Sequence, residues 1–265
     1  MSIQNLKIVA ITGAGLSAES GIPTYRGPCG VYAGIQQELG MPIEKLISPV
    51  TLKTDTELFW KYWWRIYSLS LGAQPNKAHA YLKELSETAK SFLEVTQNID
   101  GLSIAGGCSP SKIIELHGSA RRYACFRCNE EYPLEYVATY YGSIPMCSKP
   151  KCRQHPKGFL RPRTVLFGER IKSKHYSRAM AEISACDALI IIGTELHFGY
   201  LQDMLLKARL YRAYIANINL KPIDSFDTDL RNQNDVAPES IAPIHEFNVT
   251  ASTGIEQVVA RLNSL

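Results

Sequence analysis

Residues 6–27 read LKIVAITGAGLSAESGIPTYRG, an apolar run that ends abruptly in glycines. The β-branched residues among positions 6–12 favour a buried strand, and Gly13-Ala14-Gly15 breaks it before sequence that is compatible with a helix. One interpretation is a tight turn and nothing more. The other is a turn whose backbone N–H groups face a pyrophosphate at the start of a helix.

Similar apolar runs occur at residues 91–95, 188–192 and 213–218, each separated from the next by helix-compatible sequence. Strands that alternate with helices predict an α/β fold with a parallel sheet covered on both faces. Two long stretches interrupt this pattern. Residues 28–80 contain an aromatic segment with helical spacing, and residues 120–161 contain four cysteines and several prolines. We expect these two insertions to build a smaller domain.

The composition is that of an ordinary folded protein, with 265 residues, 45% hydrophobic residues and a net charge of +4. Residues 1–7 lack the pattern of a signal peptide, and no apolar run approaches the roughly 20 residues that a membrane span needs. No basic stripe interleaved with aromatic residues is visible. We expect a cytoplasmic protein, with the nucleus also compatible, that contacts neither membrane nor nucleic acid directly.

The cysteines form two close pairs, Cys125-x2-Cys128 and Cys147-x4-Cys152, eighteen residues apart. This spacing lets four thiolates converge on one zinc ion, and a site without an open position is structural. Four free cysteines are the plain alternative. A zinc ribbon that binds nucleic acid is a second possible function. Few aromatic stacking partners and the mild charge count against it.

Residues 96–102 read TQNIDGL and follow the second predicted strand, at the edge where open α/β sheets place ligands. A polar loop that caps a helix would look alike. Further along stands His117-Gly118. A lone histidine is more often structural than catalytic, although a neutral imidazole suits a general base.

Taken together, these segments resemble the sirtuin family. Residues 13–27 match its signature GAGxSxxSGIPxFRG except at Tyr25, residues 96–102 match TQNIDxL, and residues 116–118 match LHG. The resemblance implies a Rossmann-like fold, a structural zinc ion, and an NAD-dependent protein-lysine deacylase that consumes NAD as a co-substrate and acts on acyl-lysine proteins or peptides. It extends from residue 8 to about residue 219 and weakens after residue 194.

The family mechanism implies that His117 deprotonates the ribose hydroxyl relay after the acyl oxygen has attacked C1′ of the nicotinamide ribose. Asn98 would orient the ribose and a water molecule, Gln97 would bind the ribose, and Asp100 would hold the nicotinamide carboxamide. The full set of implied NAD contacts is Gly13, Ala14, Gly15, Ser17, Glu19, Thr24, Tyr25, Arg26, Gln97, Asn98, Ile99, Asp100, Gly193, Thr194, Glu195 and Asn219. Phe167-Gly168-Glu169 resembles the family segment that pairs with an extended substrate peptide.

Tyr62 and Arg65, at positions i and i+3, share one face of the predicted helix at residues 56–71. In the sirtuin branch that removes acidic acyl groups, a Y-x-x-R pair binds the acyl carboxylate, which suggests succinyl- or malonyl-lysine as substrates beside acetyl-lysine. The alternative is that the aromatic residues belong to the core and that Arg65 is solvated.

Two charge changes depart from the family pattern: Glu195 stands where the family reads GTS, and Lys221 where it reads N-x-E. A carboxylate near the pyrophosphate would weaken NAD binding. Because the two anomalies have opposite sign, we predict an ion pair between them. An unpaired Glu195 would instead favour an NAD- or ADP-ribose-binding protein with little turnover.

We therefore expect one catalytic unit over residues 1–265. Its Rossmann-like core comprises residues 1–27, 81–119 and 162–265. The smaller domain comprises the helical insertion 28–80 and the zinc-binding insertion 120–161. NAD and the acyl-lysine chain should meet between the two.

Overall fold

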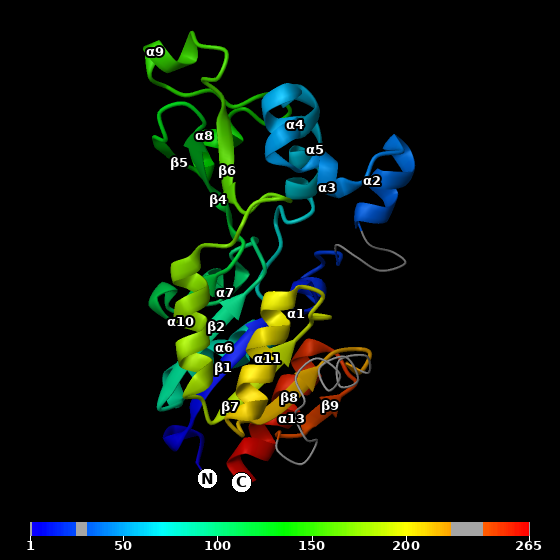
Figure 1. Cartoon of the computed structure of the whole chain (residues 1–265), viewed down its shortest axis with the longest axis vertical. Helices are drawn as coiled ribbons and strands as arrows, with labels where there is room; N and C mark the ends of the chain where they lie inside the picture. The colour runs from blue at the N-terminus through cyan, green and yellow to red at the C-terminus, as the bar shows by residue number, and fades with distance from the viewer. Residues whose placement is uncertain (1, 25–30, 224–240, 265) are drawn as a thin grey trace.

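The computed structural model describes residues 2–24, 31–223 and 241–264 and has two parts, one above the other in Figure 1. The larger part is a six-stranded sheet in the order β3-β2-β1-β7-β8-β9, with every neighbouring pair parallel. Its strands are β1 (Lys7–Thr12), β2 (Ser91–Thr96), β3 (Ile113–Glu115), β7 (Ala188–Ile192), β8 (Tyr214–Ile218) and β9 (Ile244–Phe247). The predicted parallel sheet is confirmed, and the short outer strands β3 and β9 are additions to it.

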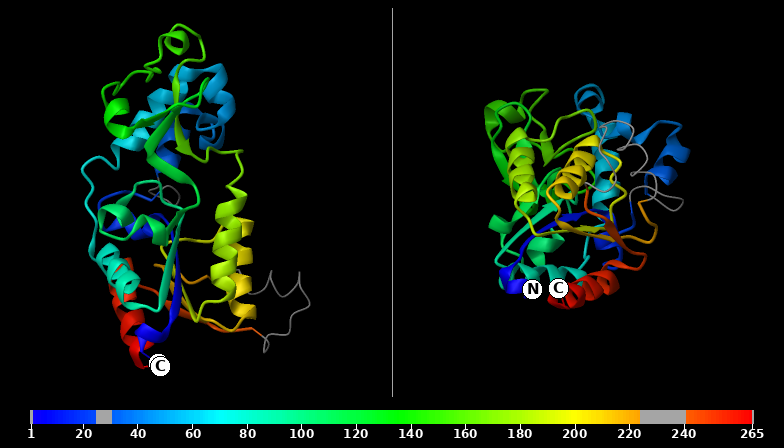
Figure 2. Two further views of the ribbon diagram at one scale, coloured as in Figure 1. Left: turned by 90° about the vertical axis from the view of Figure 1, so that its left-hand side faces the viewer. Right: turned by 60° about the horizontal axis from the view of Figure 1, so that its bottom comes forward.

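Helices cover both faces of this sheet, as the turned views in Figure 2 show. One face packs against α6 (Lys77–Thr88) and α13 (Ala251–Ser264), and the other against α10 (Ser173–Ser184) and α11 (Gly199–Leu210). Along β1, Ile8 and Ala10 belong to the first core and Val9 and Ile11 to the second. A strand that is buried on both faces needs apolar residues at every position, which explains the continuous apolar runs of the sequence.

The chain changes direction across the sheet between β1 and β7, which are neighbours although far apart in sequence. Ligands of open α/β sheets bind at such a switch point, outside the carboxyl ends of the strands. The turns after the two strands touch there. A Cβ atom on Gly15 would lie 2.5 Å from the Cα atom of Gly193, and Gly193 itself has φ +62°. These glycines are therefore required for the two turns to pack together.

The smaller part combines helices with a three-stranded antiparallel sheet in the order β5-β4-β6. Its elements are α2 (Val31–Leu39), α3 (Ile43–Leu46), α4 (Pro49–Thr54), α5 (Thr56–Ser68), β4 (Gly118–Cys125), β5 (Glu131–Pro133), α8 (Leu134–Ala138), α9 (Pro150–Arg153) and β6 (Leu160–Thr164). Trp60 of α5 stacks on Tyr123 of β4 with ring centroids 6.0 Å apart, so one core unites the two insertions. Because the two insertions share this core, we propose that they form one small domain, as predicted.

Four short elements complete the described chain: η1 (Ile3–Asn5), α1 (Ala14–Ala18), α7 (Leu102–Ala105) and η2 (Pro110–Lys112). The two chain ends lie together at the end of the larger part that is remote from the smaller one (Figure 1). Among the described helices, none combines the length and the apolar character that a membrane crossing requires.

Candidate active site

A cavity of about 960 Å³ opens at the carboxyl edge of the parallel sheet and is also lined by residues of the smaller part. This volume lies near the upper end of the range for ligand pockets. The residues predicted from the sequence that line it are Gly13, Ala14, Gly15, Glu19, Thr24, Gln97, Asn98, Ile99, His117, Phe167, Gly168, Glu169, Gly193, Thr194, Glu195 and Asn219. Tyr25 and Arg26 lie outside the described residues. The structure thus brings segments from the whole length of the chain to one cavity.

Asn98 is buried at the wall of the cavity and is held by two hydrogen bonds. Its Nδ2 donates to the carbonyl oxygen of Gly13 at 2.9 Å and to Ser17 Oγ at 3.2 Å. Ser17 Oγ in turn donates to Asp100 Oδ2 at 2.8 Å. Neither Ser17 nor Asp100 lines the large cavity. In this conformation Asp100 holds Ser17, and Ser17 holds Asn98 in place. The amide oxygen of Asn98 is left for a ligand.

Three other predicted NAD contacts also brace the framework. Gln97 Nε2 donates to Thr194 Oγ1 at 2.8 Å, which ties the segment after β2 to the turn after β7. Asn219 Nδ2 donates to the carbonyl oxygen of Thr194 at 3.2 Å. Glu19 Oε2 accepts the backbone N–H of Ser252 at 2.8 Å, at the beginning of α13. These hydrogen bonds thus hold the segments of the cavity wall together without a ligand.

His117 lies on this wall with both ring nitrogens in hydrogen bonds. Nδ1 is 3.0 Å from the carbonyl oxygen of Gln97, and Nε2 is 2.6 Å from the hydroxyl oxygen of Tyr200. Burial lowers the pKa of His117, and the bond to the Gln97 carbonyl opposes this only in part. The imidazole is therefore neutral at physiological pH, as a general base must be.

Phe198 and Tyr200, which follow β7, surround the histidine, and the sequence analysis did not assign either a role. The ring of Phe198 meets that of His117 edge-on at 5.8 Å and stacks on Tyr200 at 5.5 Å. Their one sequence signal was position: residues that follow a parallel strand lie at the ligand edge of the sheet.

Glu195 Oε2 lies within hydrogen-bond distance of His197 Nε2, at 2.6 Å. Within residues 2–24, 31–223 and 241–264, no ion pair joins Glu195 to Lys221. The partner that we predicted for Glu195 is therefore wrong, because a side chain two residues away reaches the carboxylate first. Both side chains are more than half exposed, so the pair contributes little to stability.

Tyr62 and Arg65 lie on α5, but neither lines the cavity. The Tyr62 hydroxyl donates to Glu38 Oε1 at 3.1 Å, and Arg65 forms an ion pair with the same carboxylate. The residues of α5 that line the cavity are Trp63 and Ile66. In this conformation the pair binds a carboxylate of the protein itself. Its contact with an acyl carboxylate stays a prediction.

The segment after β6 contributes Phe167, Gly168 and Glu169 to the cavity. Two guanidinium nitrogens of Arg161 bind the Glu169 carboxylate at 2.8 Å each, which makes Glu169 a brace for the segment. Gly168 has φ +89°, and no atom lies within 4 Å of the place where its Cβ would be. The backbone is thus open to a ligand at Gly168.

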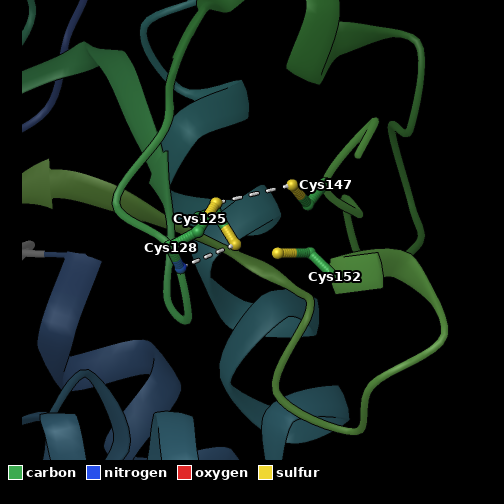
Figure 3. Close-up of side chains that lie close together, drawn as sticks. All are labelled: Cys125, Cys128, Cys147 and Cys152. Carbon is green, nitrogen blue, oxygen red and sulfur yellow. Dashed lines mark hydrogen bonds between the residues drawn. The ribbon is translucent and has the colours of Figure 1, made fainter. Parts of the chain in front are cut away.

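The four paired cysteines come together in the smaller part (Figure 3), with their sulfur atoms all within 4.8 Å of one another. Zinc–thiolate bonds of about 2.3 Å in a tetrahedron require sulfur atoms about 3.8 Å apart, and Cys128 and Cys147 are 3.9 Å apart. Cys125, Cys147 and Cys152 are buried, and none of the four lines the large cavity. The residues fit a zinc ion whose role is structural.

This arrangement defines an enzyme that binds a dinucleotide at the switch point of a parallel sheet and carries a separate structural metal site. The profile of the Sir2 family matches residues 13–198, and the chain belongs to this family. Family membership confirms the predicted enzyme class, an NAD-dependent protein deacylase of the sirtuin type, and NAD and zinc as its co-substrate and structural ion.

Relatives with assigned names and solved structures support this family membership. A protein of Pseudomonas syringae pv. tomato named NAD-dependent protein deacylase 2 is 36% identical over 219 residues, which is 82% of this chain and 86% of that protein. The NAD-dependent protein deacylase of Aquifex aeolicus is 38% identical over 193 residues, 72% of this chain and 74% of that protein. A solved complex of a Sir2 homologue with ADP-ribose has a TM-score of 0.77 at 29% identity, covering 99% of this chain and 94% of the other.

Proposed function

We propose that the protein transfers the acyl group of acyl-lysine side chains to ADP-ribose and releases nicotinamide from NAD. The observation that carries this proposal is the state of His117. Its Nδ1 donates to a backbone carbonyl, so the lone pair is on Nε2, which meets the hydroxyl of Tyr200 in the cavity that the glycine turn also lines. A similar solved structure, a Sir2 with a p53 peptide and NAD, has a TM-score of 0.74 at 26% identity and covers 96% of this chain and 92% of the other.

We assign the remaining roles from the cavity wall. The phosphates of NAD would rest against Gly13–Gly15, and the nicotinamide ribose would lie near Gln97, Asn98 and His117. His117 would take the proton of a ribose hydroxyl, and the free amide oxygen of Asn98 would orient the ribose. The acyl-lysine peptide would enter beside Gly168 and add a strand to the open backbone there.

For the acyl group, the contacts of α5 favour a neutral chain such as acetyl. Tyr62 and Arg65 are bound to Glu38, whereas the α5 residues on the cavity wall are Trp63 and Ile66. A succinyl or malonyl carboxylate would have to displace Glu38 from Arg65. We therefore expect acetyl-lysine to be the better substrate and keep the acidic acyl groups as a prediction to be tested.

Nicotinamide release from a panel of acylated peptides tests the activity itself. The zinc-loaded wild-type protein should release nicotinamide only when an acyl-lysine peptide is present, and His117→Ala should lose this release while still binding NAD. No release from any peptide, together with measurable NAD or ADP-ribose binding, would shift the assignment to a binding protein with little turnover.

The acyl preference is tested with acetyl and succinyl versions of one peptide. The wild-type protein should favour the acetyl peptide, and Glu38→Gln, which frees Tyr62 and Arg65, should raise the turnover of the succinyl peptide alone. Arg65→Met is the control, because it removes the cation that would bind either Glu38 or the succinyl carboxylate. Equal rates of the wild type on both peptides would contradict the acetyl preference. No turnover of the succinyl peptide by the wild type or by Glu38→Gln would remove the acidic-acyl hypothesis.

A further inference from the structure

The segment that follows β7 supplies a side chain for the reaction that no sequence motif indicated. Tyr200 lies in the first turn of α11 and lines the cavity, and its hydroxyl oxygen is 2.6 Å from His117 Nε2. We propose that Tyr200 is a positioning residue, whose hydroxyl holds the His117 imidazole in the neutral Nδ1–H tautomer until a ribose hydroxyl takes its place at Nε2. This inference rests on the proposed function, since it concerns the base of that reaction.

The hydrogen-bond partners settle which nitrogen of His117 carries the proton. The carbonyl oxygen of Gln97 can only accept, so Nδ1 at 3.0 Å must donate. Burial raises the pKa of Tyr200, so the phenol stays protonated and donates to Nε2. The two bonds together select the Nδ1–H tautomer. Tyr200 occupies the single lone pair of Nε2 in this structure, so a ribose hydroxyl must take the place of the phenol before Nε2 can accept its proton.

Aromatic packing fixes the direction from which Tyr200 reaches the ring. Phe198 stacks on Tyr200 with an interplanar angle of 9°, and both rings meet His117 edge-on, at 79° and 87°. The segment is anchored behind them, because Leu196 is fully buried and its carbonyl oxygen accepts a bond from Gln202 Nε2 at 3.1 Å. The phenol is thus held in place by packing as well as by its hydrogen bond.

The other titratable groups around the cavity do not compete for the imidazole. They are Glu19, Tyr32, Glu169, Arg170, Tyr176, Glu195, His197, Asp203 and Lys221. Within the part of the chain that the structure describes, the hydrogen bonds of His117 go to Gln97 and Tyr200 and to none of these groups. The phenol is therefore the one side chain whose removal changes the bonding of Nε2.

A hydrogen bond donated to Nε2 favours the neutral imidazole over the imidazolium, so its loss must raise the pKa of His117. Ring NMR signals of His117, recorded on the zinc-loaded full-length protein without substrate, measure both the pKa and the tautomer. In Tyr200→Phe the pKa of His117 should rise by roughly half a unit to one unit, and the Nδ1–H tautomer should lose its dominance. Tyr211→Phe, which removes a hydroxyl just beyond the other end of α11, should change neither quantity.

An unchanged titration of His117 in Tyr200→Phe would overturn the inference. If that variant does not fold, 3-fluorotyrosine placed at position 200 keeps the ring and makes the phenol a stronger donor. The pKa of His117 should then fall, and a pKa that stays constant would overturn the inference equally.

Activity gives an independent readout. In Tyr200→Phe, the acidic limb of the pH profile of kcat/KM, which reports the free enzyme, should move to higher pH by the same amount as the NMR titration. A fall in kcat/KM with no movement of this limb would mean a merely structural role. Because the NMR measurement needs no turnover, a protein that releases no nicotinamide but shows the shifted pKa would refute the proposed function and leave the link between Tyr200 and His117 intact.

Discussion

Glu94, in the middle of the parallel sheet, makes the stability of the protein depend on pH, and Glu94→Gln should remove that dependence. The carboxyl group is fully buried in β2. Its Oε1 accepts hydrogen bonds from Thr12 Oγ1 and Ser103 Oγ, both at 2.8 Å, whereas Oε2 has no partner among the described residues. Burial raises the pKa of Glu94 from 4.5 to about 7, and the two hydroxyl bonds oppose this shift.

A carboxyl group whose pKa is higher in the folded state keeps its proton there after the unfolded chain has lost it. Its contribution to stability is complete below the unfolded pKa of 4.5 and is lost as the pH rises through about 7. The whole shift corresponds to roughly 3 kcal/mol. Glutamine keeps the acceptor for Thr12 and Ser103 and does not titrate, so only the pH dependence should disappear.

Denaturant unfolding in the presence of zinc measures this effect. Between about pH 5 and pH 8, the free energy of unfolding of the wild type should fall relative to Glu94→Gln by roughly 2 to 3 kcal/mol. Glu84→Gln, which changes an exposed carboxylate on α6, should follow the wild type. If the difference in the free energy of unfolding between the wild type and Glu94→Gln stayed constant across this range, the buried carboxyl group would not titrate as described.

Three further predictions concern the metal site and the NAD-binding turns. In Cys128→Ser, elemental analysis should find well below one zinc ion per chain, and Tm should fall. Cys108→Ser, outside the cluster, should keep its zinc. Gly15→Ala forces a Cβ to within 2.5 Å of the Gly193 backbone, and calorimetry should show a loss of about 1 to 3 kcal/mol of stability together with a higher KM for NAD. Glu195→Gln should lower the KM for NAD by up to about fivefold at low ionic strength and by less in high salt; an unchanged KM would mean that the carboxylate does not act on the phosphates.

Much of the fold could be predicted because its main strands are buried on both faces. The strands β1, β2, β7 and β8 are buried at nearly every position. Their central apolar residues make them visible without an alignment. The strands β4 and β6 were missed because they mix buried and exposed residues and pair across a register shift near Ser119. The outer strands β3 and β9 have only three and four residues, too few to show a period.

The cysteine cluster was predicted because its local spacing is typical of a zinc site. The roles of the residues after β1 and β2 were predicted because their motifs resemble those of the sirtuin family. The partners of other side chains were not, since they depend on tertiary contacts. Tyr62 and Arg65 share a helix face, but the sequence does not show that this face meets Glu38, which precedes them by more than twenty residues. Likewise the bond between His117 and Tyr200 joins residues 83 positions apart.

The central claim is that His117 lies beside the nicotinamide ribose of a dinucleotide whose phosphates rest on the Gly13–Gly15 turn. A crystal structure of the zinc-loaded protein with NAD and an acetyl-lysine peptide tests it directly. We predict a ribose hydroxyl within hydrogen-bond distance of His117 Nε2, in place of the Tyr200 hydroxyl that is bound there without ligand, and the phosphates against the turn. A dinucleotide bound elsewhere, or one whose ribose is out of reach of His117, would contradict it.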